Sequence, residues 1–263
     1  MSMSIDPFIE EVNSYKNEGP INEKVHQRFT IKMGDIAWLN EHRGFIETNK
    51  YGFGDKAFHW MWYLIISHLA QRNPQIQALE IGVFKGQVVS LWQLIANKIG
   101  SNIDIVGISP FEGNFTAPAN FLGKIKLRIQ ARINRGNLYQ NEDYLQLVTL
   151  LFERFNLSME NVRLIKGYSN DVSIYSQLDS ASLDLLYIDG DHSYQGSLSD
   201  IKNYGPKLKP GGLLVMDDAS FYLPGNGFYK GYKSVADACA ILPQLGFSNI
   251  LNVGHNRVFR KIR

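Results

Sequence analysis

The sequence predicts an α/β protein built on a doubly wound, mostly parallel β-sheet. Two continuous apolar runs, 183–188 and 213–216, are each followed within three residues by two aspartates. Such runs are typical of strands that are buried on both faces. The segment 193–209 between them is long enough for a crossover helix, so the two strands are expected to be parallel. Strand and helix patterns also alternate along much of the remaining chain, which is typical of this fold class.

Hydrophobic periodicity also predicts most of the elements that precede residue 183. The first 55 residues show no sustained hydrophobic period, and we expect one or two short helices and loops there. Apolar residues recur at helical spacing over 56–71. A strand is expected at 77–83, a helix at 87–99 after a glycine turn, and a second strand at 103–108.

A long segment, 114–161, separates the second strand from the third at 162–166. We expect it to form a helical, lid-like insertion. Its basic side chains form one stripe at helical spacing: Lys124, Arg128, Arg132 and Arg135. The stripe is either a solvated face or a surface that recognises an anionic substrate group or a carrier protein. The chain thus divides into an N-terminal extension, 1–55, and one domain, 56–263, that carries the insertion.

The C-terminal elements are expected to close the sheet. The segment 219–232 is rich in glycine and aromatic residues, as suits a loop over a site, and a helix is expected at 233–245. The last two runs, 247–253 and 257–262, predict an antiparallel hairpin. His255 lies in its turn, where we expect it to be solvated, with facing the site as the alternative.

Composition sets limits on the kind of protein. The 263 residues are 44% hydrophobic and 20% charged, as in a soluble globular protein. A net charge of +2 gives no argument for nucleic acid. The one cysteine, Cys239, excludes an internal disulfide and is expected to pack in the core. The most apolar run, 60–70, is far shorter than the roughly 20 residues that span a bilayer. We therefore expect a cytoplasmic protein that binds neither nucleic acid nor membrane.

Four carboxylates are expected at one edge of the sheet. Asp189 and Asp191 follow the first apolar run, and Asp217 and Asp218 follow the second. The carboxyl ends of parallel strands form the ligand-binding edge of an open α/β sheet. The repulsion among these acids must be relieved by protons, by cationic partners or by a divalent cation, and Mg²⁺ or Ca²⁺ prefers oxygen ligands of this kind.

The turn after the first strand argues against a nicotinamide cofactor. A dinucleotide fingerprint needs a second glycine where this chain has Phe84. The turn instead offers Glu80, Gly82 and Gly86. An acid beside a close-approach glycine suits a cofactor that carries an ammonium and a sulfonium rather than phosphates.

These motifs resemble those of the class I S-adenosylmethionine-dependent methyltransferases. Residues 80–86 look like the first motif of that family, and 188–194 and 208–212 look like its fourth and fifth strand motifs. The resemblance covers roughly 77–218 and is closest to the metal-dependent, macrocin-type sugar O-methyltransferases. It implies a Rossmann-like methyltransferase sheet whose C-terminal hairpin contains the reversed seventh strand.

The resemblance also implies roles for individual residues. Mg²⁺ or another divalent cation would be held by Asp189, Asp217 and Asp218. Asp191 or His192 would act as the base. The residues implied for cofactor binding are Glu80, Gly82, Val83, Gly86, Ser109, Tyr168, Ser169 and Asp189.

One position departs from the family pattern. Ser109 ends the second strand, where the family usually has an acid that binds the ribose hydroxyls. A hydroxyl makes weaker hydrogen bonds than a carboxylate, so either cofactor affinity is reduced or Glu112 substitutes.

The function implied is transfer of a methyl group from S-adenosylmethionine to a hydroxyl of a small acceptor, such as a sugar-containing natural product. The cation would bind that hydroxyl and lower its pKa, and the base would remove its proton. A homo-oligomer and a carrier-protein partner are both compatible with the sequence.

Other interpretations remain open at this stage. Metal-independent N- or C-methylation, a nicotinamide-dependent oxidoreductase and a non-catalytic protein with the same fold are the rival functions. Asp189 could contact only the cofactor amine, with Asp217 and Asp218 as a helix or loop cap. Asp191 and His192 could serve as the N-cap of the helix that starts near Ser193.

Overall fold

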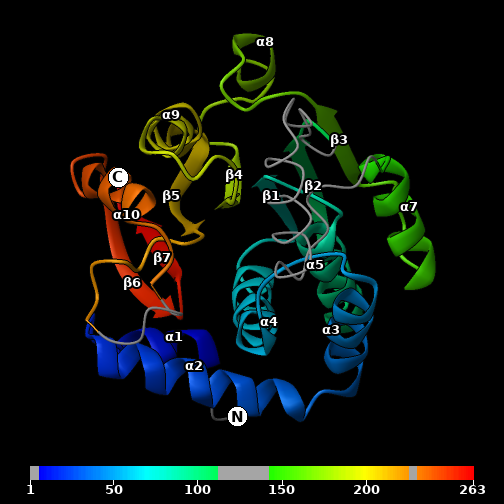
Figure 1. Cartoon of the computed structure of the whole chain (residues 1–263), viewed down its shortest axis with the longest axis horizontal. Coiled ribbons are helices and arrows are strands. Elements are labelled where there is room, and N and C mark those ends of the chain that lie inside the picture. The colour runs from blue at the N-terminus through cyan, green and yellow to red at the C-terminus, as the bar shows by residue number, and fades with distance from the viewer. Residues whose placement is uncertain (1–5, 112–141, 225–229) are drawn as a thin grey trace, which may run out of the picture.

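The computed structural model describes residues 6–111, 142–224 and 230–263. One sheet of seven strands runs through it, in the order β3-β2-β1-β4-β5-β7-β6 (Figure 1). The strands are β1 (Gln75–Ile81), β2 (Asn102–Ser109), β3 (Val162–Lys166), β4 (Leu183–Ile188), β5 (Leu208–Met216), β6 (Phe247–Val253) and β7 (Asn256–Lys261). Only β7 runs antiparallel to its neighbours, β5 and β6. The predicted doubly wound, Rossmann-like sheet with a C-terminal antiparallel hairpin is confirmed.

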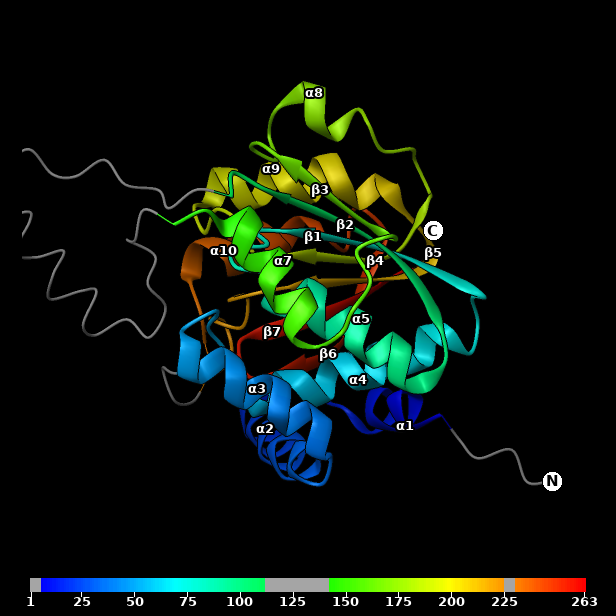
Figure 2. The same cartoon turned by 90° about the vertical axis from the view of Figure 1, so that its right-hand side faces the viewer.

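Helices cover both faces of this sheet. Helices α4 and α5 lie on one face, and α9 lies on the other (Figure 2). The helices are α1 (Pro7–Ser14), α2 (Gly19–Gly34), α3 (Ala37–Asn49), α4 (Lys56–Ala70), α5 (Gln87–Ile99), α7 (Tyr144–Arg154), α8 (Val172–Tyr175), α9 (Tyr194–Tyr204) and α10 (Lys233–Ala238), with short 3₁₀ turns at Gly205–Lys207 and Cys239–Ile241. No helix in the described part of the chain is long and apolar enough to cross a bilayer.

The two-sided cover explains the continuous apolar runs. On β4, Leu185 and Tyr187 pack in the core beneath α4 and α5, whereas Leu186 and Ile188 pack in the core beneath α9. Every residue of β4 is buried. Successive side chains of a strand point to opposite faces, so a strand that is covered on both sides needs apolar residues at nearly every position.

The expectation of one or two short N-terminal helices was wrong. Three helices precede α4, and α2 has 16 residues. Their buried faces include polar side chains that are hydrogen-bonded to distant parts of the chain. For example, Asn22 donates to the carbonyl of Gly254 at 2.8 Å, and His42 contacts Ser90 at 3.0 Å. These buried polar residues interrupt the apolar period on which the sequence interpretation relied.

Two other predicted elements differ in the structure. The helix expected at 233–245 ends as α10 at Ala238 and continues only as a 3₁₀ turn. Pro243 lacks a backbone N–H and cannot extend a helix, which agrees with the early end. Helix α7 lies within the predicted insertion. The basic stripe predicted for the same insertion lies outside the described residues, as does Glu112.

The carboxyl ends of β1, β4 and β5 lie side by side. Backbone hydrogen bonds continue past the strands: Asp189 N donates to Ile81 O at 2.9 Å, and Asp217 N donates to Ile188 O at 3.0 Å. Gly82 has a φ of 97°. A Cβ at Gly82 would lie 1.9 Å from the carbonyl oxygen of Asp189. The glycine therefore permits both the left-handed backbone and the close contact between the two strand ends.

We predict that Gly82→Ala lowers the free energy of unfolding by about 3 kcal/mol or more, because it combines backbone strain with a backbone clash. Gly100→Ala is the matched control. Gly100 also has a positive φ, of 70°, but a Cβ there would meet nothing within 4 Å. Its cost should be the strain alone, about 1–2 kcal/mol. Urea unfolding of both variants measures the difference, and equal costs would contradict the close contact.

Candidate active site

Two cavities meet at the ends of β1 and β4. The first has a volume of about 560 Å³ and reaches from Gly82 to the residues that follow β2 and β3. The second, of about 490 Å³, reaches from Gly82 toward the ends of β4 and β5 and the loop before α4. Gly82, Phe84, Asp189 and Gly190 line both. The two cavities therefore form adjoining parts of one site at the switch point of the sheet, where open α/β folds bind ligands.

The residues predicted to bind a cofactor divide between these cavities. Ser109, Tyr168 and Ser169 line the 560 Å³ cavity, and Glu80 and Val83 line the 490 Å³ cavity. As noted above, Gly82 and Asp189 line both.

Gly86 lies in neither cavity. It is the N-cap residue of α5, with a φ of 91°, and a Cβ there would lie 2.9 Å from the side chain of Val148 on α7. Gly86 thus lies at the start of α5, at a position where a side chain would clash with Val148.

Glu80 is a buried acid with an unused oxygen. Its exposed fraction is 2%, and its Oε2 atom has no hydrogen-bond partner. Burial, and next the charge of Asp189, raise the pKa of Glu80 well above its ordinary value. A buried carboxyl oxygen without a partner at the wall of a cavity fits a ligand that brings a hydrogen-bond donor, such as an ammonium group.

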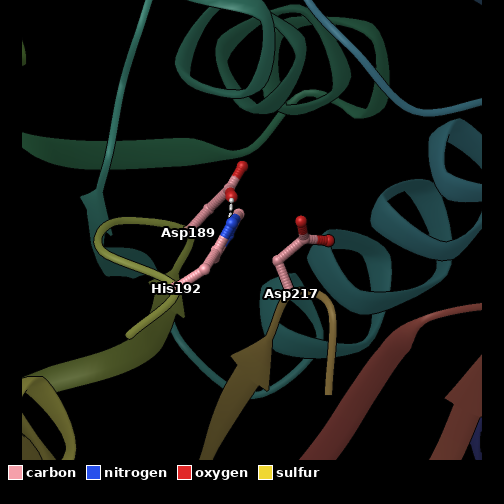
Figure 3. A group of neighbouring side chains, drawn as sticks. All are labelled: Asp189, His192 and Asp217. Atoms are coloured by element: carbon pink, nitrogen blue, oxygen red, sulfur yellow. Dashed lines mark hydrogen bonds and ion pairs between the residues drawn. The ribbon is translucent and has the colours of Figure 1, made fainter. Parts of the chain in front are cut away.

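Carboxylates and histidines alternate at the ends of β4 and β5. Asp189 accepts a hydrogen bond from the Tyr187 hydroxyl at 3.1 Å, and its Oδ1 lies 3.3 Å from Nε2 of His192 (Figure 3). The Nδ1 atom of His192 lies 3.8 Å from Oδ2 of Asp218. Asp217 faces the same space from the end of β5 (Figure 3).

His255 belongs to this cluster, and the expectation that it is solvated was wrong. Its Nδ1 lies 3.0 Å from Oδ1 of Asp218, and its Nε2 lies 3.6 Å from Oδ1 of Asp217. The hairpin pairs with β5 so that Val258 stands opposite Val215. This register places the β6–β7 turn beside the end of β5. Nothing in the local sequence of the turn specifies that pairing.

The cluster shifts the ionisation of its members. Burial would lower the pKa of both histidines, but the neighbouring aspartates outweigh burial and raise the pKa of His192 and of His255 to about 9. Burial, followed by the charge of Asp189, raises the pKa of Asp217 well above its ordinary value. Burial would also raise the pKa of Asp218, but the hydrogen bond and charge of His255 hold it below the ordinary value. The repulsion among the acids is thus relieved by protons and by imidazolium groups.

The donor atoms also fit a divalent cation. Two groups of described residues hold their ligand atoms within 4.8 Å of one another: Asp189, His192 and Asp217, and Asp217, Asp218 and His255. Asp217 belongs to both. Each group thus contains two of the three carboxylates predicted as metal ligands, together with a histidine. Carboxylate oxygens and imidazole nitrogens are established ligands of divalent metals.

Asp191 and His192 differ in position, although they are adjacent in the chain. Both carboxylate oxygens of Asp191 accept hydrogen bonds from Ser193, one from its N–H at 2.9 Å and one from its hydroxyl at 2.8 Å. Ser193 itself is the N-cap of α9, so neither predicted residue has that role. Asp191 lines the 560 Å³ cavity, whereas His192 lines the 490 Å³ cavity with the other acids.

Aromatic residues that the sequence interpretation did not single out for the site support the two histidines. The Phe58 ring on α4 stacks on His255 with centroids 4.7 Å apart. The Tyr232 ring, just before α10, stacks on His192 at 4.9 Å. Both aromatic residues line the 490 Å³ cavity. The glycine- and aromatic-rich composition of 219–232 indicated a loop over a site that includes Tyr232, but no sequence signal distinguished Phe58 from an ordinary core residue.

We predict that the stability of the metal-free protein falls as pH rises from about 6.5 to 9. The pKa of His255 is about 9 in the folded protein and 6.5 at its ordinary value, so folding binds a proton in this range. The stabilisation that this bound proton provides is complete below pH 6.5. It is lost as pH rises through about 9, the pKa of His255 in the folded protein. Thermal unfolding in EDTA measures the decline, and His255→Asn should make it shallower. If thermal stability declined equally with pH in the wild type and in His255→Asn, the raised pKa of His255 would be contradicted.

The comparisons with known sequences identify a methyltransferase pattern. Residues 79–219 match a family model described as a methyltransferase domain. The chain is 29% identical over 182 residues to protein R132 of Acanthamoeba polyphaga mimivirus, an alignment that covers 68% of this chain and 66% of the viral protein. It is 26% identical over 107 residues to protein y4gI of Sinorhizobium fredii, covering 41% of this chain and 10% of that protein. The chain thus spans less than two thirds of the length of these relatives.

Solved structures share the fold at low sequence identity. The O-methyltransferase NovP is 18% identical, with a TM-score of 0.59 over 81% of this chain and 83% of NovP. The S-adenosylhomocysteine-bound methyltransferase PaMTH1 of Podospora anserina is 15% identical, with a TM-score of 0.58 over 93% of this chain and 98% of that one. The calicheamicin methyltransferase CalS11 is 13% identical, with a TM-score of 0.53 over 95% of this chain and 96% of CalS11.

Proposed function

Because the chain belongs to this methyltransferase-domain family, and through it to the class I S-adenosylmethionine-dependent methyltransferases, we propose that it is a divalent-cation-dependent O-methyltransferase. Its acceptor is a hydroxyl on a small molecule, such as a sugar-containing natural product. The observation that carries this proposal is the position of the Asp189, Asp217 and Asp218 cluster, which shares a cavity with Glu80 and Gly82. The donor of the methyl group and the acceptor can therefore meet at the ends of β1 and β4.

The cofactor is proposed to occupy both cavities. Its adenosine part suits the 560 Å³ cavity, where Ser109, Tyr168 and Ser169 offer hydroxyl and aromatic groups. Its ammonium group suits the unpartnered oxygen of Glu80. Gly82 lines both cavities, so the cofactor can pass over this residue from one cavity to the other. Ser109 is buried, with an exposed fraction of 7%, and can both donate and accept one hydrogen bond at the ribose.

The acidic cluster is proposed to hold the cation. A bound divalent cation lowers the pKa of a hydroxyl that it contacts and orients its oxygen. Asp189 and Asp218 each lie with Asp217 in a group whose ligand atoms are within 4.8 Å of one another, and all three are proposed to offer carboxylate oxygens from the ends of two neighbouring strands. Asp217 exposes only 13% of its side chain, which limits competition from water, and the Tyr187 hydroxyl orients Asp189.

His192 is the better placed of the two proposed bases. It lines the same cavity as the acids, and stacking on Tyr232 sets the plane of its ring. Asp191 has both oxygens engaged by Ser193 in the other cavity. We therefore assign removal of the acceptor proton to His192 in its neutral form, which a bound cation would favour because its charge replaces that of the imidazolium. Asp191 is assigned a positioning role at the start of α9.

We expect removal of the cation with EDTA to abolish methyl transfer and MnCl₂ or MgCl₂ to restore it. Asp217→Asn should lower kcat/KM at least 100-fold, because it removes a carboxylate that is proposed to hold the cation at the reacting oxygen. A radiolabelled methyl-transfer assay against a panel of small hydroxyl compounds provides the measurement. Asp237→Asn, on the exposed side of α10, is the matched control. Full activity of the metal-free wild type would overturn the metal requirement.

We expect His192→Asn to lower kcat by about 100-fold or more with a much smaller change in KM, since general base catalysis typically contributes that much. Asp191→Asn should lower kcat less than tenfold, because it changes a hydrogen bond to Ser193 and not the proton acceptor. Steady-state kinetics separates the two. A larger loss in Asp191→Asn than in His192→Asn would reverse the assignment.

A metal-independent N- or C-methyltransferase is the second candidate. The observation in its favour is that His192 and His255, as imidazolium groups, already relieve part of the repulsion among the acids. Such an enzyme would keep its activity in EDTA and would methylate an amine or a carbon in the acceptor panel. Calorimetric titration should show that S-adenosylhomocysteine binds if either candidate function is correct. A non-catalytic protein should give no binding in the same titration.

A further inference from the structure

His255 lies where a ligand of the proposed cation is needed. We propose that its Nε2 atom binds the cation, so that the ligands are of mixed nitrogen and oxygen type and favour Mn²⁺ or Co²⁺ over Mg²⁺. This inference rests on the function proposed above and adds a residue and a metal preference to it. It differs from the all-carboxylate set that the sequence predicted.

The contacts of His255 determine which nitrogen is available. Its Nδ1 lies 3.0 Å from Oδ1 of Asp218, which can only accept when ionised, so Nδ1 carries the hydrogen of that bond. When the ring is neutral, Nε2 therefore presents its lone pair. This atom faces Oδ1 of Asp217 at 3.6 Å. Metal-binding histidines commonly donate one N–H to a carboxylate and bind the metal through the other nitrogen.

The ring is held in this orientation from several sides. Phe58 stacks on one face with an interplanar angle of 29°. The carbonyl of His255 accepts a hydrogen bond from Ala219 N at 2.8 Å, which ties the hairpin turn to the residue after the acidic pair. The side chain keeps 21% of its surface exposed, and His255 lines the 490 Å³ cavity. His255 is thus rigidly placed yet open to the cavity.

The backbone at Asp218 supports the same arrangement. Asp218 has a φ of 50°, a left-handed conformation that is uncommon for residues other than glycine. Its carbonyl accepts a hydrogen bond from Tyr232 N at 2.8 Å, which helps to hold that conformation. Strained residues of this kind concentrate at functional sites. Here the turn directs Asp218 toward His255, so we infer that Asp218 orients the imidazole.

The nitrogen ligand changes which metal is preferred. Mg²⁺ binds oxygen ligands almost exclusively, whereas imidazole suits transition metals. Transition metals bind most mixed sites more tightly than Mg²⁺ does, so the preference of the wild type alone is not decisive. The decisive quantity is the decrease in the ratio of Mn²⁺ affinity to Mg²⁺ affinity when the imidazole nitrogen of His255 is removed.

The experiment compares wild type, His255→Asn and His192→Asn, each freed of metal by chelation. In His255→Asn the amide can still donate to Asp218, but the metal-binding nitrogen is lost. Calorimetric titration with MnCl₂ and with MgCl₂ should show about a tenfold or greater loss of Mn²⁺ affinity in His255→Asn and a loss of Mg²⁺ affinity at least threefold smaller. His192→Asn should leave the ratio of the two affinities unchanged within about twofold.

Pulsed electron paramagnetic resonance of the Mn²⁺-loaded wild type gives a readout that needs no variant to fold. Modulation from a directly coordinated imidazole nitrogen is expected, and His192→Asn should retain it. Absence of that modulation, its loss in His192→Asn, or an unchanged affinity ratio in His255→Asn would each overturn the inference. S-adenosylhomocysteine titration separates the two proposals: nitrogen coordination without cofactor binding leaves this inference standing and overturns the proposed function.

Discussion

The close contact between the backbones of β1 and β4 is the constraint on which the site depends. Asp189 N donates to Ile81 O, and Gly82 lies directly against the carbonyl of Asp189. A side chain at Gly82 would clash with the backbone of Asp189 and force the two strand ends apart. The same contact brings Asp189 close enough to Glu80 to raise the pKa of that buried acid. One backbone contact therefore positions both the cavity wall at Glu80 and the acidic cluster that includes Asp189.

Charge is the second constraint on this edge of the sheet. Asp217 lies within 4.8 Å of ligand atoms of Asp189 in one group and of Asp218 in another, and burial raises its own pKa. Two histidines lie between them, each oriented by an aromatic ring from a different part of the chain. This arrangement keeps the acids together in the absence of a cation. It also places imidazole nitrogens where the sequence suggested oxygen ligands only.

The N-terminal helices take part in building the site. Asn22 on α2 bonds to Gly254 in the hairpin turn, next to His255. Asp55 caps α4 through Ala57 N and pairs with His26, so it sets where α4 begins. Phe58 on the first turn of α4 can then stack on His255. Residues from both ends of the chain thus converge on one wall of the 490 Å³ cavity.

The sequence by itself determined where the central strands lie along the chain and which acids follow them. Those features are local: an apolar run marks β4, and Asp189 follows it, whatever the rest of the chain does. Glu80 and Gly82 were found in the same way, from one turn. Only the tertiary structure decided that His255 joins Asp217 and Asp218, because that contact depends on the antiparallel register of β5 and β7. The N-terminal helices likewise escaped the sequence interpretation, since their buried polar residues are satisfied by partners more than 40 positions away.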